Sequence, residues 1–136
     1  MSESTAFPTR PGFTGHIGMQ KTGFAQEYAR FELTLGPEHL NPLGIPHGGV
    51  YATILDTALG SSGGWTGDPD SFLPSVTLNL NVSYLSQPRG GTRLICEGHR
   101  VGGGRSIYFA EGVVQDETGQ VLARATGTFK MVKPRA

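Results

Sequence analysis

The chain has 136 residues, no net charge at pH 7 and a single cysteine, Cys96. Its length suits one domain that can bury a hydrophobic core without disulfides or metals. The balanced charge argues against a nucleic-acid or anionic-membrane partner, and one cysteine excludes a disulfide framework. No apolar run approaches membrane-spanning length, and the first residues lack the basic and apolar segments of a secretion signal. We therefore expect a cytoplasmic protein.

The first half of the chain predicts an arm, a strand, a loop and a helix. Residues 1–24 are rich in Gly, Pro and Thr, which predicts an irregular N-terminal arm before a single domain over residues 25–133. Alternation over residues 28–35 predicts a strand. Pro and Gly punctuate residues 37–46, and a helix is expected from Gly48 to about Gly60.

The second half predicts strands. Apolar side chains alternate with polar ones from Val76 to Tyr84, which indicates a half-buried strand. Three more strands are expected at residues 93–101, 106–114 and 120–132, with turns between them. A strand, a helix and four consecutive strands predict an α+β domain with one long helix packed on an antiparallel sheet.

The predicted helix carries one charged residue, Asp56. At 100° per residue, an apolar sector contains Val50, Tyr51, Ile54, Leu55 and Ala58. Asp56 falls on the other side, among Gly49, Ala52, Thr53 and Gly60. Burying an ionised carboxylate in an apolar element costs several kcal/mol of free energy unless the group is paired or hydrated. Asp56 is therefore a candidate functional residue, although a helix acid satisfied by a threonine or by water is the simpler alternative.

The start of this helix is the second candidate group. Gly48 and Gly49 lie in the first turn, where unpaired N–H groups and the helix dipole can polarise a carbonyl. A rise of about 1.5 Å per residue separates them from Asp56 by about 10–12 Å. One carbonyl cannot contact both groups of one chain. If both act on the same centre, two antiparallel copies of the helix must meet across a two-fold axis.

The segment that contains these residues resembles a known family. The pattern Asn41-x-x-Gly-x-x-His47-Gly-Gly, followed by Asp56, is similar to that of the PaaI-like (phenylacetic-acid-degradation type) acyl-CoA thioesterases. Weaker similarity continues through residues 77–85, 104–106 and 119–123. The resemblance implies the hot-dog fold, in which an antiparallel sheet of five to six strands wraps one long central helix. It also implies homodimers with shared active sites, and we expect a tetramer built as a dimer of dimers.

The resemblance assigns roles to the acid and to the amides. Asp56 would act as general base or nucleophile on a thioester, and the N–H groups of Gly48 or Gly49 would polarise its carbonyl. His47 would orient the site, although alone it is more typical of a loop or helix cap. No second histidine stands at ligand spacing, so we expect no metal.

Two further residues have a simple structural alternative. By resemblance, Asn41 would hydrogen-bond near the carbonyl or the attacking water, and Thr77 would position that water. On sequence alone, Asn41 is a turn residue before a proline, and Thr77 is an ordinary strand threonine. Asn79 stands where some relatives carry an aspartate, and we expect it to bind the substrate or CoA as an uncharged side chain.

Coenzyme A phosphates require cationic or N–H donors. Arg105 is the best candidate because the family commonly has Gly-Lys/Arg-Ser/Thr where this chain has Gly104, Arg105 and Ser106. The other candidates are Arg89, Arg93 and Arg100. Each of these arginines could equally be an ordinary solvated side chain.

The function that we expect is hydrolysis of acyl-CoA thioesters, with aryl or medium-chain acyl groups, to free acid and CoA. Coenzyme A is then part of the substrate and no separate cofactor is needed. Two other classes stay open. One is a non-catalytic acyl-CoA-binding module, and the other is a hydratase or dehydratase with His47 as the principal base.

Overall fold

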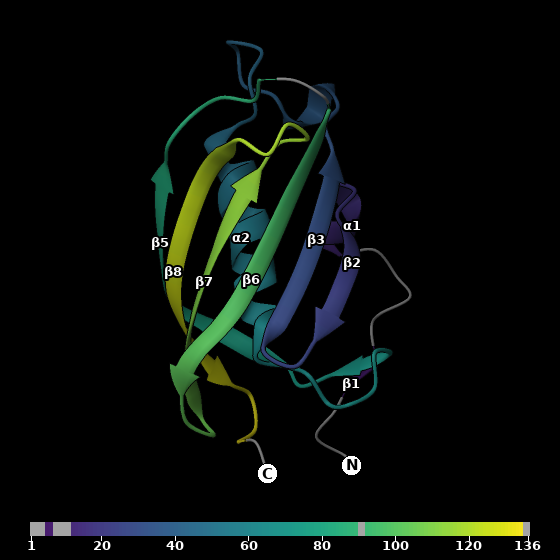
Figure 1. The fold of residues 1–136 in the computed structure, drawn as a ribbon. Coiled ribbons are helices and arrows are strands. Elements are labelled where there is room, and N and C mark those ends of the chain that lie inside the picture. Colours follow the sequence, from purple (N-terminus) through teal and green to yellow (C-terminus); the bar gives the residue numbers. More distant parts are fainter. Residues whose placement is uncertain (1–4, 7–11, 90–91, 135–136) are drawn as a thin grey trace.

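The computed structural model describes residues 5–6, 12–89 and 92–134 (Figure 1). The longer elements are α2 (Gly48–Ser62), β2 (Gln20–Ala25), β3 (Tyr28–Thr34), β5 (Ser75–Tyr84), β6 (Arg93–Gly103), β7 (Ile107–Gln115) and β8 (Val121–Met131). The shorter ones are β1 (Thr5–Ala6), α1 (Phe13–His16), η1 (Pro37–His39) and β4 (Ser71–Phe72). The six longer strands form one antiparallel sheet in the order β2-β3-β6-β7-β8-β5.

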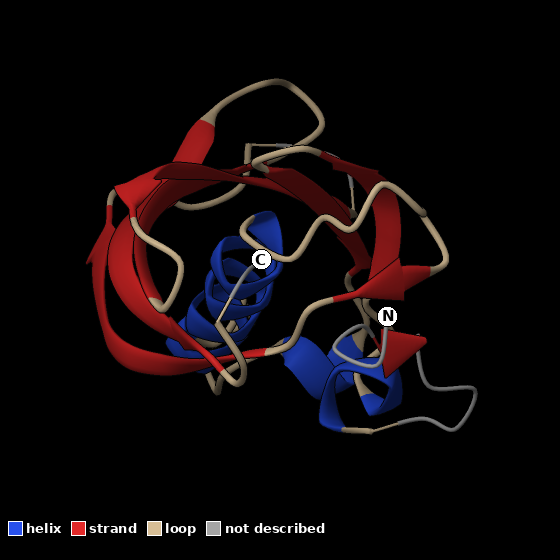
Figure 2. Ribbon diagram, turned by 90° about the horizontal axis from the view of Figure 1, so that it is seen from below, coloured by secondary structure: helices blue, strands red, loops and turns tan. Residues whose placement is uncertain are grey.

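The sheet curves around α2, which lies in its hollow (Figure 2). The residues of α2 that are buried are Tyr51, Ile54, Leu55, Ala58, Leu59 and Ser62. They join a core that includes Leu94, Tyr108 and Phe129 of the strands. This arrangement confirms the expected α+β hot-dog architecture and most of the predicted apolar sector of the helix. Among the described residues, no helix is long and apolar enough to span a membrane.

The helix begins at the predicted residue and ends slightly later than predicted. His47 is its N-cap, with extended backbone angles, and Gly48 is its first residue. It continues to Ser62 and stops at Gly63. A Cβ at position 63 would lie 2.5 Å from the Tyr108 ring, so only glycine fits at this close contact.

The prediction of an irregular arm through residue 24 is wrong for its last part. Residues 20–24 belong to β2, which pairs with β3. The register shifts between Lys21 and Gly23, and this irregularity removes the clean alternation that would have revealed the strand. The hydrogen bonds that stabilise β2 come from its pairing with β3, and this pairing cannot be inferred from the residues of β2 alone. Residues 1–4 and 7–11 of the expected arm lie outside the described part of the chain.

A bulge interrupts the alternation of β5 and corrects the predicted faces of this strand. Its pairing with β8 shifts between Thr77 and Asn79, so Leu78 is an extra residue. Leu80 and Val82 pack against the core, as expected, whereas Val76 and Leu78 are 52% and 51% exposed. The bulge changes the parity of the strand. Thr77 therefore faces the helix, on the same side of the sheet as Leu80 and Val82.

Candidate active site

Asp56 and Thr77 meet between α2 and β5. The Thr77 hydroxyl donates a hydrogen bond of 2.6 Å to Oδ1 of Asp56. Asp56 is half-buried, and Thr77 is exposed. The acid of the helix thus lies at the boundary of the core, where a hydrogen-bond donor and solvent can both satisfy its charge.

A cleft of about 190 Å³ opens beside this pair. Besides Asp56 and Thr77, its lining residues are Thr57, Gly60, Ser61, Phe72, Leu73, Pro74 and Ser75. Hydroxyl groups therefore lie near the acid, and apolar side chains form the part contributed by residues 72–74. Within the described residues, no group of three His, Cys, Asp or Glu side chains could hold a metal ion.

The two glycine amides of the first turn of α2 differ in their partners among the described residues. His47 Nδ1 accepts a hydrogen bond of 2.8 Å from the Gly49 N–H, which requires that Nδ1 carry no proton. The Gly48 N–H has no hydrogen-bond partner in the part of the chain that is described. His47 therefore acts as the helix cap in this structure, and Gly48 supplies the amide that is open to a ligand.

The amide end and the acid stay apart within one chain, as the sequence predicts. Asp56 is eight positions after Gly48 in the helix, which at about 1.5 Å per residue places them about 12 Å apart. A thioester carbonyl bound at the Gly48 N–H cannot be attacked from Asp56 of the same chain.

Tyr84, which the sequence analysis did not single out, contacts the amide end. Its hydroxyl donates a hydrogen bond of 2.9 Å to the carbonyl oxygen of Gly48. Its ring lies beside that of Tyr51, with 6.1 Å between the ring centroids. In the sequence, Tyr84 is the last apolar residue of an alternating strand, and no sequence signal distinguishes it from a core residue.

Asn41 organises the loop that leads into the helix. Its Oδ1 accepts hydrogen bonds from the backbone N–H groups of Leu43 at 2.9 Å and of Ile45 at 3.4 Å. Its own N–H donates to the Ile45 carbonyl oxygen at 2.8 Å. These are the bonds of a turn residue. In this conformation, the side-chain oxygen of Asn41 already accepts hydrogen bonds within the loop.

Asn79 is not brought to the acid. It follows the bulge of β5, is exposed, and lines a hollow of about 340 Å³ with Val101, Phe109 and Thr128. A second hollow of about 380 Å³ involves Glu97, Glu111 and Arg124. Neither hollow contains Asp56.

The candidate phosphate-binding arginines are in different environments. Arg105 is exposed in the loop between β6 and β7, and has no ion pair within the described residues. Its neighbours shape that loop: the Gly104 N–H donates to the Ile107 carbonyl oxygen, and the Ser106 carbonyl oxygen accepts from Met131. Arg105 therefore remains available to an anion.

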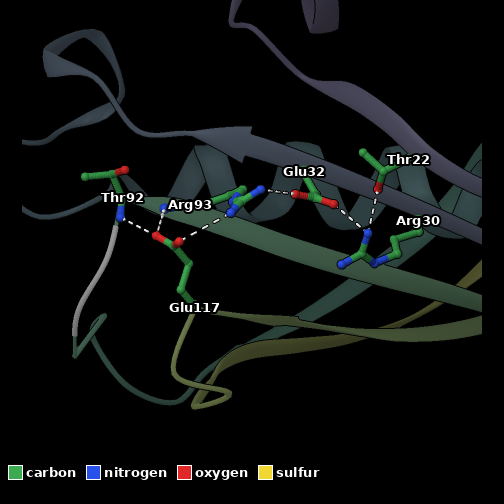
Figure 3. Close-up of polar contacts among 6 residues, drawn as sticks. All are labelled: Thr22, Arg30, Glu32, Thr92, Arg93 and Glu117. Atoms are coloured by element: carbon green, nitrogen blue, oxygen red, sulfur yellow. Dashed lines mark hydrogen bonds and ion pairs between the residues drawn. The ribbon is translucent and has the colours of Figure 1, made fainter.

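Two of the other candidates are held by carboxylates. Arg93 pairs with Glu32 at 3.1 Å and with Glu117 at 3.4 Å, in a network that Figure 3 shows. Arg100 pairs with Glu27 at 3.1 Å. Both guanidinium groups already have acidic partners, which makes them weaker candidates for a phosphate.

Arg89 lies at the opposite end of the sheet from Arg105. It precedes β6, whereas Arg105 follows it, and a strand of this length spans about 33 Å. The Arg89 N–H donates to Oδ2 of Asp116 at 2.7 Å. The Thr118 hydroxyl, together with backbone N–H groups, lowers the pKa of Asp116 to about 2. Asp116 thus fixes the backbone that carries Arg89.

Comparisons with known proteins identify the family. The family model of the thioesterase superfamily matches residues 43–123, which include His47, Gly48, Asp56 and Thr77. Acyl-coenzyme A thioesterase 13 of Mus musculus is 26% identical over 98 residues, covering 71% of this chain and 68% of that protein. The solved structure of the BH2602 protein from Bacillus halodurans with CoA is 28% identical, with a TM-score of 0.76, and the match covers 93% of this chain and 82% of that one. The PaaI protein of E. coli, from the phenylacetic acid degradation operon, has a TM-score of 0.76 at 17% identity, covering 89% and 84% of the two chains.

Proposed function

We propose, from the premise that this chain belongs to the thioesterase superfamily, that it hydrolyses acyl-CoA thioesters to a free acid and CoA. The observation that carries this proposal is the hydrogen bond between Thr77 and Asp56 at the edge of an apolar-walled cleft. The sequence relative that is an acyl-coenzyme A thioesterase and the solved structure that contains CoA support the choice of substrate.

In the proposed reaction, Asp56 activates water. The Thr77 hydroxyl occupies Oδ1, which orients the carboxylate and leaves Oδ2 for the water. Asp56 takes a proton from the water while the water oxygen bonds to the carbonyl carbon. The tetrahedral intermediate then collapses, the C–S bond breaks, and Asp56 gives the proton that it took from water to the departing CoA thiolate. Direct attack by Asp56, followed by hydrolysis of the anhydride, is the variant in which it acts as nucleophile.

The first turn of α2 is the proposed electrophilic group. The Gly48 N–H has no partner among the described residues, and the Gly49 N–H becomes available when the carbonyl oxygen displaces the His47 ring. Both lie at the positive end of the helix dipole, which favours the negative charge of a tetrahedral intermediate. Since these amides lie about 12 Å from Asp56 in one chain, we propose that the partner subunit supplies them.

Strand β5 is the proposed dimer interface. It is the last strand in the sheet order, and its large side chains Val76 and Leu78 are about half exposed. A long apolar edge strand without a partner promotes pairing with another chain. Antiparallel pairing of β5 with its copy across a two-fold axis would also make the two α2 helices antiparallel. This would bring the first turn of one helix toward Asp56 of the other. Assembly of two such dimers into a tetramer is part of the same proposal.

The phosphates of CoA are proposed to bind at Arg105, which has no ion pair among the described residues. Gly104 and Ser106 would shape its loop. Within one chain, Arg89 lies at the opposite end of the sheet from Arg105, so both arginines can serve one CoA only if they come from different subunits. Guanidinium groups suit phosphates because they donate two parallel hydrogen bonds.

The cleft beside Asp56 is the proposed acyl site. Its volume of about 190 Å³ is below the range of about 300–1,000 Å³ that is typical of pockets for drug-sized ligands. Phe72, Leu73 and Pro74 offer an apolar wall. This apolar wall suits the aryl or medium-chain acyl groups that we propose as substrates.

A thiol-release assay over a panel of acyl-CoAs tests the proposed function. We expect release of CoA thiol, fastest for aryl and medium-chain acyl groups. Tight binding without thiol release would indicate an acyl-CoA-binding module. Consumption of an enoyl-CoA without thiol release would indicate a hydratase. Either result would contradict the proposal.

A further inference from the structure

The peptide group between Gly48 and Gly49 is held at both ends by side chains. Its carbonyl oxygen accepts a hydrogen bond of 2.9 Å from the Tyr84 hydroxyl. Its N–H donates one of 2.8 Å to His47 Nδ1. Tyr84 belongs to β5, whereas His47 is the cap that precedes the helix. Two groups outside the helix thus fix the plane of this one peptide.

Gly48 and Gly49 are consecutive glycines, whose backbone has the greatest conformational freedom. Hydrogen bonds at both ends of the peptide group between them therefore restrict that freedom. The Tyr84 ring lies directly beside Gly48, where an added Cβ would meet a ring carbon at 3.4 Å. The ring is in turn placed against Tyr51, tilted by 55°. The Tyr84 side chain is 54% exposed, and its contacts with Gly48 and Tyr51 accompany the hydrogen bond from its hydroxyl to the Gly48 carbonyl oxygen.

We propose that Tyr84 is a positioning residue for the thioester carbonyl. This inference rests on the proposed function, in which the first-turn amides polarise that carbonyl. By donating to the Gly48 carbonyl oxygen, Tyr84 fixes the orientation of the Gly49 N–H. It also strengthens this N–H as a donor, because hydrogen bonds in a chain polarise one another. Donors that are fixed before the reaction stabilise developing charge without reorganisation.

The arrangement also explains how the amide can change partners without losing its orientation. In the structure, His47 Nδ1 occupies the Gly49 N–H. A thioester oxygen that binds there must take the place of the imidazole nitrogen. Tyr84 contacts the opposite end of the peptide group, so its hydrogen bond persists through the exchange. Tyr84 acts through the peptide and does not contact the substrate.

Tyr84→Phe tests this inference, because it removes the hydroxyl and keeps the ring. Removing an oxyanion donor outright costs about 10²–10³ in kcat, and we expect a smaller loss of about tenfold for this indirect role. KM for acyl-CoA should change little. The matched control is Tyr28→Phe, which removes a hydroxyl that donates to Glu97 instead. Both variants should have a melting temperature above the assay temperature. Both should also keep the oligomeric state of the native protein.

An infrared measurement separates positioning from a general structural effect. In an Asp56→Asn background, a ¹³C-carbonyl acyl-CoA should bind without being hydrolysed, and its C=O stretch should fall below the value in solution. Adding Tyr84→Phe should return the stretch toward the solution value, whereas Tyr28→Phe should not. An unchanged stretch and an unchanged kcat in Tyr84→Phe, with hydrolysis by the native protein intact, would overturn only this inference. Absence of hydrolysis by the native protein would overturn the proposed function as well.

Discussion

The Thr77 hydroxyl donates a 2.6 Å hydrogen bond to Oδ1 of Asp56, and it does so from a strand whose alternation is broken at the next residue. Because Leu78 is an extra residue, Thr77 faces the helix on the same side as Leu80. In an unbroken strand, Thr77 and Leu80 would lie on opposite faces. The bulge is therefore what lets one strand supply both a core residue and a polar partner for the acid.

Replacement of Asp56 should abolish thioester hydrolysis without unfolding the protein. We expect Asp56→Asn to lower kcat by about 10²–10⁴, the usual contribution of a general base, and by more if Asp56 is the nucleophile. Asp56 is only half-buried, so the circular dichroism spectrum should be unchanged. The control is Asp68→Asn, an exposed acid of the loop before β4. A kcat close to that of the native protein in Asp56→Asn would exclude the proposed role.

Thr77 variants test the hydrogen bond to the acid. Thr77→Val, which has a similar shape and no hydroxyl, should lower kcat about 10–100-fold. A hydrogen bond to a charged group contributes about 1.5–3 kcal/mol, and 1.36 kcal/mol corresponds to tenfold. Thr77→Ser retains the hydroxyl and should recover most of the rate. If Thr77→Val and Thr77→Ser have equal rates, the hydroxyl has no part in the reaction.

Arg105→Ala should affect binding more than chemistry. An exposed charge pair contributes about 0.2–1 kcal/mol, so KM for an acyl-CoA should rise by up to about fivefold while kcat changes little. The increase should disappear for a short thioester that lacks the nucleotide. Arg124→Ala, which removes an exposed arginine of β8, serves as the control. Equal KM changes for the long and short substrates would remove Arg105 from the phosphate site.

Asp116 should make folding stability depend on acidic pH. Its pKa is lowered to about 2, chiefly by the hydrogen bond from Thr118. A lowered pKa means that this stabilisation is complete above the ordinary carboxyl pKa of about 4 and is lost as the pH falls toward 2. Asp116→Asn should therefore lower the melting temperature at pH 7, and the difference from the native protein should shrink as the pH falls to 2. A difference that stays constant over this range would contradict this assignment.

The sequence predicted the helix and the sheet well, because both depend on local signals. His47 precedes two glycines and an apolar run, and the helix does begin at Gly48. Strands β6, β7 and β8 follow clear alternation, and turns separate them. These features need no knowledge of the neighbouring elements.

Features that depend on pairing were missed. Strand β2 can be identified only from its pairing with β3, because the register shift after Lys21 disturbs the alternation of its side chains. The bulge at Leu78 comes from the pairing of β5 with β8, so the sequence alone placed Thr77 on the wrong face. The two acidic partners of Arg93 also lie far from it in the sequence, which is why an ion-paired arginine was indistinguishable from a solvated one.

In the proposed dimer, each active site takes its acid from one subunit and its amides from the other. Gly48→Pro removes the Gly48 N–H, and it should fold because proline is accepted at the first helical position and His47 already has φ −63° and ψ 140°. Asp56→Ala removes the acid.

The decisive measurement is thiol release by mixed dimers of Asp56→Ala and Gly48→Pro, compared with thiol release by each variant alone. The two variants are unfolded together and reassembled, and the mixed dimers are isolated by two different affinity tags. A mixed dimer has one site with both defects and one with neither, so we expect about half of the native activity per dimer. Activity that stays at the level of the separate variants in verified mixed dimers would contradict it.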